Sequence, residues 1–451
     1  MSLHMSRNAS LRATWRSCVC TVVALCGPTR LLAQPTESAA MFRGSPAHSG
    51  VYASSVTPTL SATAWTFQTN GRVFSSPAVA NGVVVFGSTD QQVYAVGARD
   101  GALRWKFTTQ GPVTSSPAIV GDLAYVASLD GRVYAIDMAT GAKRWSFATR
   151  GERRFTAPGI HGIQPRTELM PDPYDMFISS PVVSNGRVYI GSGDGGVYAL
   201  DAATGALVWR FATGNVVHAT PAIADGIVYI GSWDRNFYAL DATTGQKQWA
   251  YETGQDTVIY NQVGIVSSAA ISGDVVLFGG RDGFFYALDR RSGTLRWRHD
   301  NNHGWVIASP AVRNGVVYFP TSDGTRFKAL DVTTGTRVFD VANKTVSFSS
   351  PAVVNQAVFY GTSDGWLHAI DASSGATLAE FQTDGSRANA NRYIGPDGRM
   401  RGDALYPDRT HSGIVIGLDR MFSLGAIISS PVVVDGLLFV GSTDGKVYAL
   451  R

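Results

Sequence analysis

The sequence predicts an all-β fold: an eight-bladed β-propeller of four-stranded antiparallel blades, whose last blade is closed by the N-terminal strand. Two observations predict it. A short motif recurs eight times along the chain, and each copy is followed by the same series of turns and alternating apolar residues. Charged residues are only 16% of the chain and hydrophobic residues are 45%, which excludes a disordered protein and a coiled coil.

The recurring motif is SSPA or a close variant, and it marks the start of each repeat. Its third position falls at Pro77, Pro117, Pro181, Pro221, Ala269, Pro310, Pro351 and Pro431. The intervals are 40, 64, 40, 48, 41, 41 and 80 residues, so insertions separate some of the repeats. A unit of about 40 residues is typical of a propeller blade, and eight units predict eight blades.

Each repeat predicts four strands, as its third copy illustrates. A tight turn at Asn185-Gly186 follows the motif and supplies the positive φ angles that a hairpin needs. An alternating strand and a second turn lead to the third strand, VYALD at 197–201. A Thr-Gly turn then precedes a fourth strand that carries Trp209, and the other repeats follow the same order.

The closure of the ring is predicted by a missing strand. The eighth repeat stops at Arg451 and lacks its fourth strand. Residues 64–67 stand before the first motif, with Trp65 at the spacing of the other tryptophan strands. Pairing this strand with the last blade would join the two ends of the chain and leave no open sheet edge.

Residues 1–33 are interpreted as a signal peptide, because scattered arginines precede an apolar stretch at 18–27 and small residues precede Gln34. The apolar stretch is too short for a transmembrane span, and none is expected. The three cysteines, Cys18, Cys20 and Cys26, all lie in this leader. We expect a periplasmic or secreted protein; the alternative to cleavage after Ala33 is acylation of Cys26, which would give an outer-membrane lipid anchor.

The expected organisation after the leader is an extended segment at 34–59 and one propeller domain at 60–451. The domain carries major insertions at 151–177 and 384–426. The formal charge of +4 is accounted for by the four arginines of the leader, so residues 34–451 are neutral overall. This balance argues against a nucleic-acid partner.

The segment VYALDAATGALVW at 197–209 and its siblings resemble the tryptophan-docking repeat of PQQ-type (pyrroloquinoline quinone) propellers. That family includes quinoprotein alcohol dehydrogenases and the outer-membrane assembly factor BamB, and the resemblance covers residues 60–451. The repeated tryptophans and serines are interpreted as packing residues, and the aspartate before each Thr-Gly as a turn cap. Trp233-Asp234 is interpreted as a chance match to a different propeller repeat.

We predict that the functional residues lie where insertions interrupt the repeats. Four insertions, at 151–177, 254–266, 300–307 and 384–426, each join a fourth strand to the next motif, so they should share one face of the ring. The candidate residues for binding a protein partner or a ligand are Arg153, Arg154, His161, His218, Tyr260, Asn261, Gln262, Asn302, His303, Trp305, Arg387, Arg392, Arg409 and His411.

Charge suggests which partner this face would take. We expect Arg153, Arg154, Arg392 and Arg409 to be its leading contacts with an acidic partner. The acidic residues that balance these arginines should lie away from this face, in the second turns and the Asp-x-x-Thr-Gly turns. Four of the candidate residues are histidines, which would add positive charge below about pH 6.5.

The resemblance also implies a catalytic alternative. Quinoprotein dehydrogenases use an adjacent cysteine pair, a calcium ion held by Glu, Asn and Asp, and a catalytic aspartate. Residues 34–451 contain no cysteine, and Glu152 and Glu168 are the only glutamates in the insertions. We therefore assign no catalytic, cofactor or metal residue, expect neither PQQ nor calcium, and predict a monomeric, non-enzymatic scaffold with a BamB-like role in outer-membrane protein assembly. The alternatives are a PQQ-dependent dehydrogenase and a propeller that binds a small ligand or carbohydrate.

Overall fold

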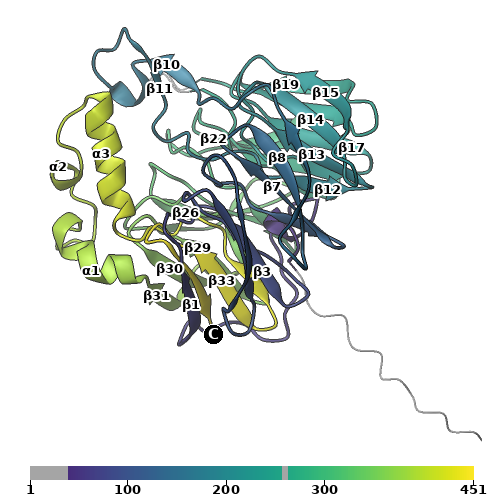
Figure 1. Ribbon diagram of the computed structural model, residues 1–451. Coiled ribbons are helices and arrows are strands. Elements are labelled where there is room, and N and C mark those ends of the chain that lie inside the picture. Colours follow the sequence, from purple (N-terminus) through teal and green to yellow (C-terminus); the bar gives the residue numbers. More distant parts are fainter. Residues whose placement is uncertain (1–38, 256–262) are drawn as a thin grey trace, which may run out of the picture. The chain divides into compact units, whose positions relative to one another are not determined.

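The computed structural model describes residues 39–255 and 263–451, which belong to one unit, Glu37–Arg451. The described residues form eight four-stranded antiparallel sheets arranged as the blades of a propeller (Figure 1). The predicted fold class is confirmed.

The blades follow the repeats in order. The first four are β2 (Ala78–Ala80), β3 (Val83–Gly87), β4 (Gln92–Gly97) and β5 (Leu103–Thr108); β6 (Ala118–Val120), β7 (Leu123–Ser128), β8 (Arg132–Asp137) and β9 (Lys143–Ala148); β12 (Val182–Ser184), β13 (Arg187–Gly191), β14 (Gly196–Asp201) and β15 (Leu207–Ala212); β16 (Ala222–Ala224), β17 (Ile227–Gly231), β18 (Asn236–Asp241) and β19 (Lys247–Glu252). The last four are β20 (Ala270–Ser272), β21 (Val275–Gly279), β22 (Phe284–Asp289) and β23 (Leu295–Asp300); β24 (Ala311–Arg313), β25 (Val316–Pro320), β26 (Arg326–Asp331) and β27 (Arg337–Ala342); β28 (Ala352–Val354), β29 (Ala357–Gly361), β30 (Trp366–Asp371) and β31 (Thr377–Gln382); β32 (Val432–Val434), β33 (Leu437–Gly441), β34 (Lys446–Leu450) and β1 (Thr63–Gln68).

The last blade is closed by the N-terminal strand, as predicted. Strand β1 pairs antiparallel with β34, and Trp65 lies opposite Ala449. The indole Nε1 of Trp65 donates a hydrogen bond to the carbonyl of Ala98 in the first blade, at 3.0 Å. Strand β1 and the last strand, β34, therefore both belong to the eighth blade, and its outer edge contacts the first blade.

The repeated tryptophans join neighbouring blades, which confirms their structural role. Each donates its Nε1–H to a carbonyl of the following blade; the further pairs are Trp105 to Met138, Trp145 to Ala202, Trp209 to Ala242, Trp249 to Arg290 and Trp297 to Val332. The glycine of the receiving turn is needed for this approach. At Gly101, whose φ is 65°, an added Cβ would lie 2.7 Å from the ring of Trp65.

The aspartates before each Thr-Gly cap their turns, as predicted. Oδ1 of Asp201 accepts hydrogen bonds from the backbone of Ala203 at 3.1 Å and from the backbone and hydroxyl of Thr204, both at 2.8 Å. The other five carboxylates bond their own turns in the same way, and Asp289 also accepts from Arg296 of the following strand, so these residues serve the scaffold.

Hydroxyl groups of the SSPA motifs form a ring around the axis of the propeller. The backbone N–H of the second motif residue donates to the hydroxyl of the same residue in the next blade, at 2.8–3.1 Å. The donor–acceptor pairs are Ser76 to Ser116, Ser116 to Ser180, Ser180 to Thr220, Thr220 to Ser268, Ser268 to Ser309, Ser309 to Ser350, and Ser430 to Ser76. The repeated hydroxyl is thus explained by bonds between blades.

The segment that follows the leader crosses the inner strands on the far side of this ring. Backbone atoms of residues 39–52 bond to the innermost strand of several blades; the partners are Val79, Ile119, Ile223, Ile271, Val312 and Val353. Phe42, in the short helix η1 (Phe42–Gly44), reaches a central void of about 70 Å³ that the ring hydroxyls also line. The channel is therefore closed at the end opposite the insertions.

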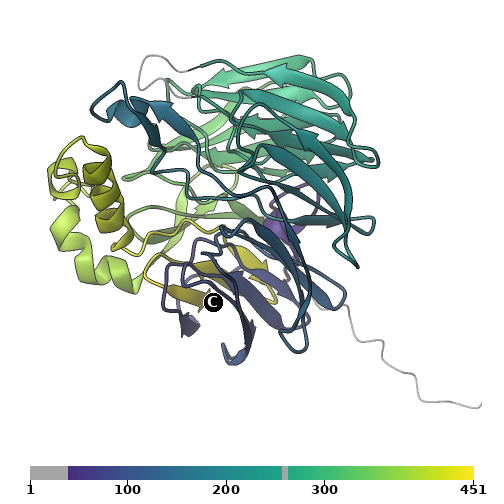
Figure 2. The same cartoon turned by 45° about the horizontal axis from the view of Figure 1, so that its top comes forward.

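The two long insertions carry their own elements, on one side of the ring of blades in both views (Figures 1 and 2). The first contains β10 (Thr156–Pro158), the short helix η2 (Ile160–Gly162) and β11 (Leu169–Pro171). The last contains α1 (Asp384–Tyr393), α2 (Gly402–Leu405) and α3 (His411–Phe422). Threonine hydroxyls cap α1 and α3: Thr383 accepts from the N–H of Ser386, and Thr410 from that of Gly413.

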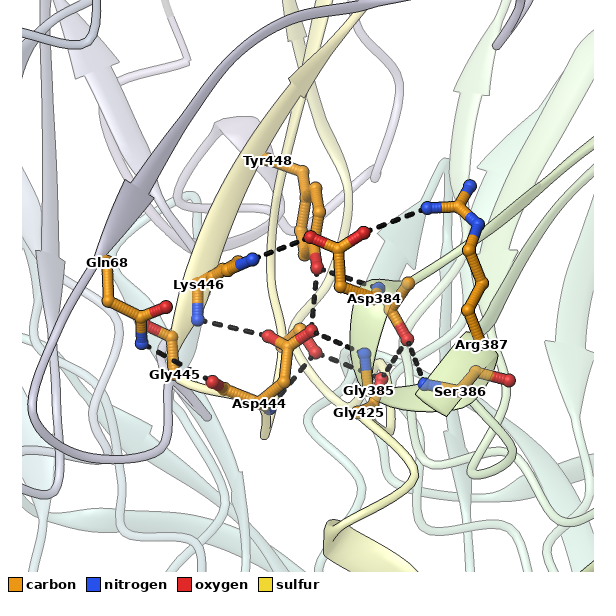
Figure 3. Close-up of polar contacts among 12 residues, drawn as sticks. Gln68, Asp384, Gly385, Ser386, Arg387, Gly425, Asp444, Gly445, Lys446 and Tyr448 are labelled. Carbon is orange, nitrogen blue, oxygen red and sulfur yellow. Dashed lines mark hydrogen bonds and ion pairs between the residues drawn. The ribbon is translucent and has the colours of Figure 1, made fainter. Parts of the chain in front are cut away.

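Helix α1 is bound to the eighth blade at its first turn (Figure 3). The N–H of Asp384 donates to the hydroxyl of Tyr448 at 3.0 Å, and that hydroxyl donates to Asp444 at 2.6 Å. The carboxylate of Asp384 accepts from Lys446 at 2.6 Å and from Arg387 at 2.9 Å. The helical insertion therefore begins at a fixed point of the scaffold.

Candidate functional site

The first and last insertions contact each other above the mouth of the channel. Gln164 and Thr410 form a parallel β-bridge, and Nε2 of His411 lies 3.2 Å from the carbonyl oxygen of Pro171. The hydroxyls of Tyr174 and Tyr406 lie 3.0 Å apart. The first and last insertions therefore share one face and form a single cover, whereas the insertion at 254–266 lies partly outside the described residues.

The first insertion is fixed by a stacking contact and by carboxylates. Phe155 stacks on Trp233 of the fourth blade, with ring centroids 4.3 Å apart and planes at 19°. The N–H of Phe155 donates to Asp175 at 2.7 Å, and Glu152 accepts from the N–H of Gly193 at 2.7 Å. A loop with these anchors offers a defined surface for binding.

His218 lies between two carboxylates at the mouth of the channel. Its Nδ1 is 2.6 Å from Oδ1 of Asp175, and its Nε2 is 2.8 Å from Oε1 of Glu152. Burial alone would lower the pKa of His218, but the two carboxylates outweigh it and raise the pKa to about 10. The imidazole is therefore a permanent cation at neutral pH.

A second buried charge cluster lies beside the first. Asp172 accepts from Nη1 of Arg281 at 2.9 Å and lies 2.7 Å from Nε2 of His161. Burial would raise the pKa of Asp172, yet the charge of Arg281 and the contact with His161 hold it below its ordinary value. The guanidinium of Arg281 lies over the rings of Trp233 and Trp305, at 4.6 and 4.9 Å from their centroids.

Between this cluster and the helical insertion is a cavity of about 460 Å³. Its aromatic wall is made by Tyr174, Trp305, Phe348 and Tyr406. Tyr406 fits tightly against α3, because a Cβ at Gly417 would lie 2.0 Å from its ring. The polar groups of the wall include His161, Arg281, Ser322, Asp323, Asp408 and Arg409.

Asp323 differs from its counterparts in other blades. In six blades of the described chain, the aspartate of the second turn accepts a hydrogen bond from the tyrosine four residues later; these pairs are Asp90–Tyr94, Asp130–Tyr134, Asp194–Tyr198, Asp234–Tyr238, Asp282–Tyr286 and Asp444–Tyr448. The sixth blade has one extra residue in this turn, and Lys328 takes the place of the tyrosine.

The carboxyl of Asp323 consequently faces the cavity. Its hydrogen-bond partner among the described residues is the Oγ of Ser322, at 3.3 Å. The side chain is exposed to solvent where it lines the cavity. Burial raises the pKa of Asp323, against the attraction of Arg281 and His161.

The structure brings together only part of the predicted site. His161, Trp305 and Arg409 line the cavity, and His411 contacts the first insertion beside it. Arg153, Arg154, Arg392, Asn302 and His303 are exposed on the surface, and Arg387 is paired with Asp384 at the root of α1. Tyr260, Asn261 and Gln262 lie outside the described residues.

Two expectations about charge were wrong. His218 is buried and already protonated near neutral pH, so it cannot meet a partner or gain charge below pH 6.5. The second-turn aspartates lie on the same face as the insertions: Asp194 accepts from the N–H of Arg150, and Asp282 from that of Gly254. They bind the backbone that leaves each fourth strand, because the second turn and that connection emerge at the same edge of a blade.

Sequence reasoning missed Arg281, Trp233, Asp172, Asp175 and Asp323. Arg281, Trp233 and Asp323 occupy second turns. Arg281 and Trp233 depart from the repeat without a change in its length, whereas the turn of Asp323 has one added residue. Arg281 stands where other blades have Thr89, Leu129, Gly193, Ser363 and Thr443. Such point departures were a usable signal, and Trp233 is another of them: it packs on both Phe155 and Arg281, a role that the comparison with another repeat did not reveal.

The residues do not fit the calcium and quinone group that the resemblance implies. The three cysteines lie at 18, 20 and 26, so no cysteine pair stands in the propeller sequence. Glu152 and Asp175 are both bound to the imidazolium of His218, and Asp172 is bound to Arg281. A cationic side chain thus already neutralises the carboxylates at the mouth of the channel.

Residues 39–255 and 263–451 contain no group of three or more His, Cys, Asp or Glu side chains placed to hold a metal ion. In the same residues, no helix has the length and apolar character that crossing a bilayer requires.

Comparisons with known proteins identify solved structures with a similar fold. No curated protein matches the chain. The fold is similar to BamB from Moraxella catarrhalis (TM-score 0.61, 17% identity, covering 86% of this chain and 97% of that one). It is also similar to a quinohemoprotein alcohol dehydrogenase from Comamonas testosteroni (TM-score 0.67, 17% identity, 93% and 81%) and to a europium-containing methanol dehydrogenase (TM-score 0.64, 17% identity, 90% of each). At these identities the likeness concerns the fold alone.

A family model matches the sequence itself, over residues 51–162, 164–300 and 262–396. It therefore spans most of the propeller, from the N-terminal segment to the first helix of the last insertion. Together with the eight blades and their docking tryptophans, this match shows that the chain belongs to the family described as outer membrane protein assembly factor BamB.

Proposed function

We propose that this protein is a non-enzymatic propeller of the periplasm that binds a protein partner at its inserted face, in a BamB-like role in outer-membrane protein assembly. The family match supports the role, and the leader at residues 1–33 supports the compartment. Acylation at Cys26 would add an anchor to the outer membrane, while cleavage after Ala33 would leave the protein free.

The observation that carries the proposal is a set of four exposed arginines on fixed insertions: Arg153, Arg154, Arg392 and Arg409. Among the residues that the structure describes, none of the four has a carboxylate within ion-pair distance, whereas Arg72, Arg210 and Arg281 are each paired. Guanidinium groups bind carboxylates through paired hydrogen bonds, so an acidic protein surface would complement this face.

A dehydrogenase that uses PQQ is the enzymatic alternative, and the charge clusters at the channel mouth do not favour it. Protein incubated with calcium and PQQ would be assayed with an artificial electron acceptor on alcohols and aldoses. Turnover that depends on the cofactor would contradict the scaffold proposal and show that the protein is an enzyme.

The arginine proposal is tested by capture from a periplasmic extract with a chemical cross-linker. The variant carries Arg153→Ala, Arg154→Ala, Arg392→Ala and Arg409→Ala. A matched control removes four exposed cations from the opposite face: Arg99, Lys143, Lys247 and Arg337. We expect at least about tenfold weaker capture with the first variant, a loss that added salt reproduces in the unmodified protein. Equal capture by both variants, or a loss confined to the control, would contradict the proposal.

A further inference from the structure

We propose that the cavity over the channel mouth binds an uncharged carbohydrate of one or two sugar rings. The proposal goes beyond the arginine face, because it assigns a small-molecule ligand to a cavity that shares only Arg409 with that face. Its volume of about 460 Å³ falls within the range of small-molecule sites and exceeds that of a buried water cluster.

The aromatic wall suits the faces of a sugar ring. Tyr174 and Tyr406 are partly exposed, with their hydroxyls 3.0 Å apart, and Phe348 and Trp305 complete the apolar lining of the cavity. A pyranose presents patches of C–H groups on its faces, and these pack on the negative face of an aromatic ring. The tyrosine hydroxyls can meanwhile bond to the ring's own hydroxyls.

Asp323 supplies the acceptor that sugar hydroxyls need. The tyrosine that bonds this aspartate in six other blades of the described chain is absent here, so the carboxyl faces the cavity with Ser322 as its hydrogen-bond partner among the described residues. A carboxyl that accepts two neighbouring hydroxyls would be fully satisfied. This unmet acceptor, produced by one extra residue in the turn, has no role in the scaffold.

The charge of the wall indicates that the ligand is neutral. Asp172 balances Arg281 and also bonds His161, while Asp408 is bound to the backbone and hydroxyl of Thr410 at 2.8 and 2.5 Å. Of the remaining groups, Asp323 and Arg409 have opposite sign. A dicarboxylate would meet one cation and one carboxyl, whereas a polyhydroxylated molecule can accept from Arg409 and donate to Asp323 at once.

Titration calorimetry on the full, naturally processed protein tests the proposal. The sugar probes are glucose, N-acetylglucosamine, sucrose, maltose and cellobiose at up to about 10 mM, and the anionic probes are succinate and citrate. We expect at least one sugar to bind saturably, with affinity reduced by about tenfold or more in Asp323→Asn and in Tyr406→Ala. Asp403→Asn and Tyr393→Ala remove a carboxylate and a half-buried tyrosine of the same insertion outside the cavity, and should leave affinity unchanged.

Three results would overturn the proposal. They are no saturable binding of any of these sugars, sugar affinity that neither Asp323→Asn nor Tyr406→Ala reduces, and binding of the anions alone that these two variants weaken. Thermal melting of each variant accompanies the titrations. If Tyr406→Ala fails to fold, the isosteric Asp323→Asn decides the outcome by itself.

Discussion

His218 Nδ1 lies 2.6 Å from Oδ1 of Asp175, although the two residues are 43 positions apart and belong to different parts of the propeller. His218 precedes the first strand of the fourth blade, and Asp175 lies in the insertion between the second and third blades. Glu152 holds the other ring nitrogen at 2.8 Å. One imidazolium therefore fastens both ends of the first insertion to the mouth of the channel.

Replacing His218 by glutamine should destabilise the protein strongly. The change leaves Glu152 and Asp175 buried without their cation, and removing one partner of a buried pair costs about 3–5 kcal/mol. Urea unfolding of the variant and the unmodified protein gives the difference in free energy of unfolding. The control His411→Gln alters a half-buried histidine with one contact, at Pro171, and should cost less than about 1 kcal/mol. Equal losses in the two variants would mean that the carboxylates do not depend on His218.

The same histidine predicts how stability changes with pH. Its pKa is about 10 in the folded protein and about 6.5 when unfolded, so folding takes up a proton between these values. The stabilisation is complete below about pH 6.5 and is lost as pH rises towards 10, by up to about 1.4 kcal/mol per pH unit. Unfolding in urea at several pH values should show a steeper decline for the unmodified protein than for His218→Gln. Parallel profiles would contradict a raised pKa.

The repeats made the propeller scaffold predictable, whereas the cavity residues differ from the repeat at single positions and were not predicted. The eight blades, the closure by Trp65 and the turn caps all follow from residues that recur at fixed spacing, since a shared structural role demands the same residue each time. Motif spacing alone does not reveal the role of a single departure such as Arg281, because its partner lies far along the chain: Asp172 is 109 residues from Arg281. The partners of a buried charge depend on how the insertions fold back, and the spacing of motifs contains no information about that.

The hydroxyl of Tyr448 should stabilise the attachment of the helical insertion, residues 384–426, to the eighth blade (Figure 3). Tyr448→Phe removes the hydroxyl that accepts from the N–H of Asp384 and donates to Asp444, which should cost about 1–3 kcal/mol. Limited proteolysis should then cut within residues 384–426 faster than in the unmodified protein. Tyr94→Phe is the matched control, because Tyr94 bonds Asp90 at 2.8 Å in a blade preceded by a short connection. Faster cleavage of that segment in both variants would show that general destabilisation, and not the root of α1, is responsible.

Closure of the ring should depend on β1 rather than on the segment that precedes it. Three chains separate the two: one that starts at residue 34, one that lacks residues 34–60, and one that lacks residues 34–70. The second loses the backbone bonds of residues 39–52 to the inner strands but keeps β1 paired with β34. The third also exposes the edge of β34, which is prone to association, and removes the bond from Trp65 to Ala98 that joins the eighth blade to the first. Thermal melting with light scattering should therefore show a lower but cooperative transition for the second chain, and a broad transition with aggregation for the third. If the third chain melts as sharply and as high as the second, the N-terminal strand is not what closes the propeller.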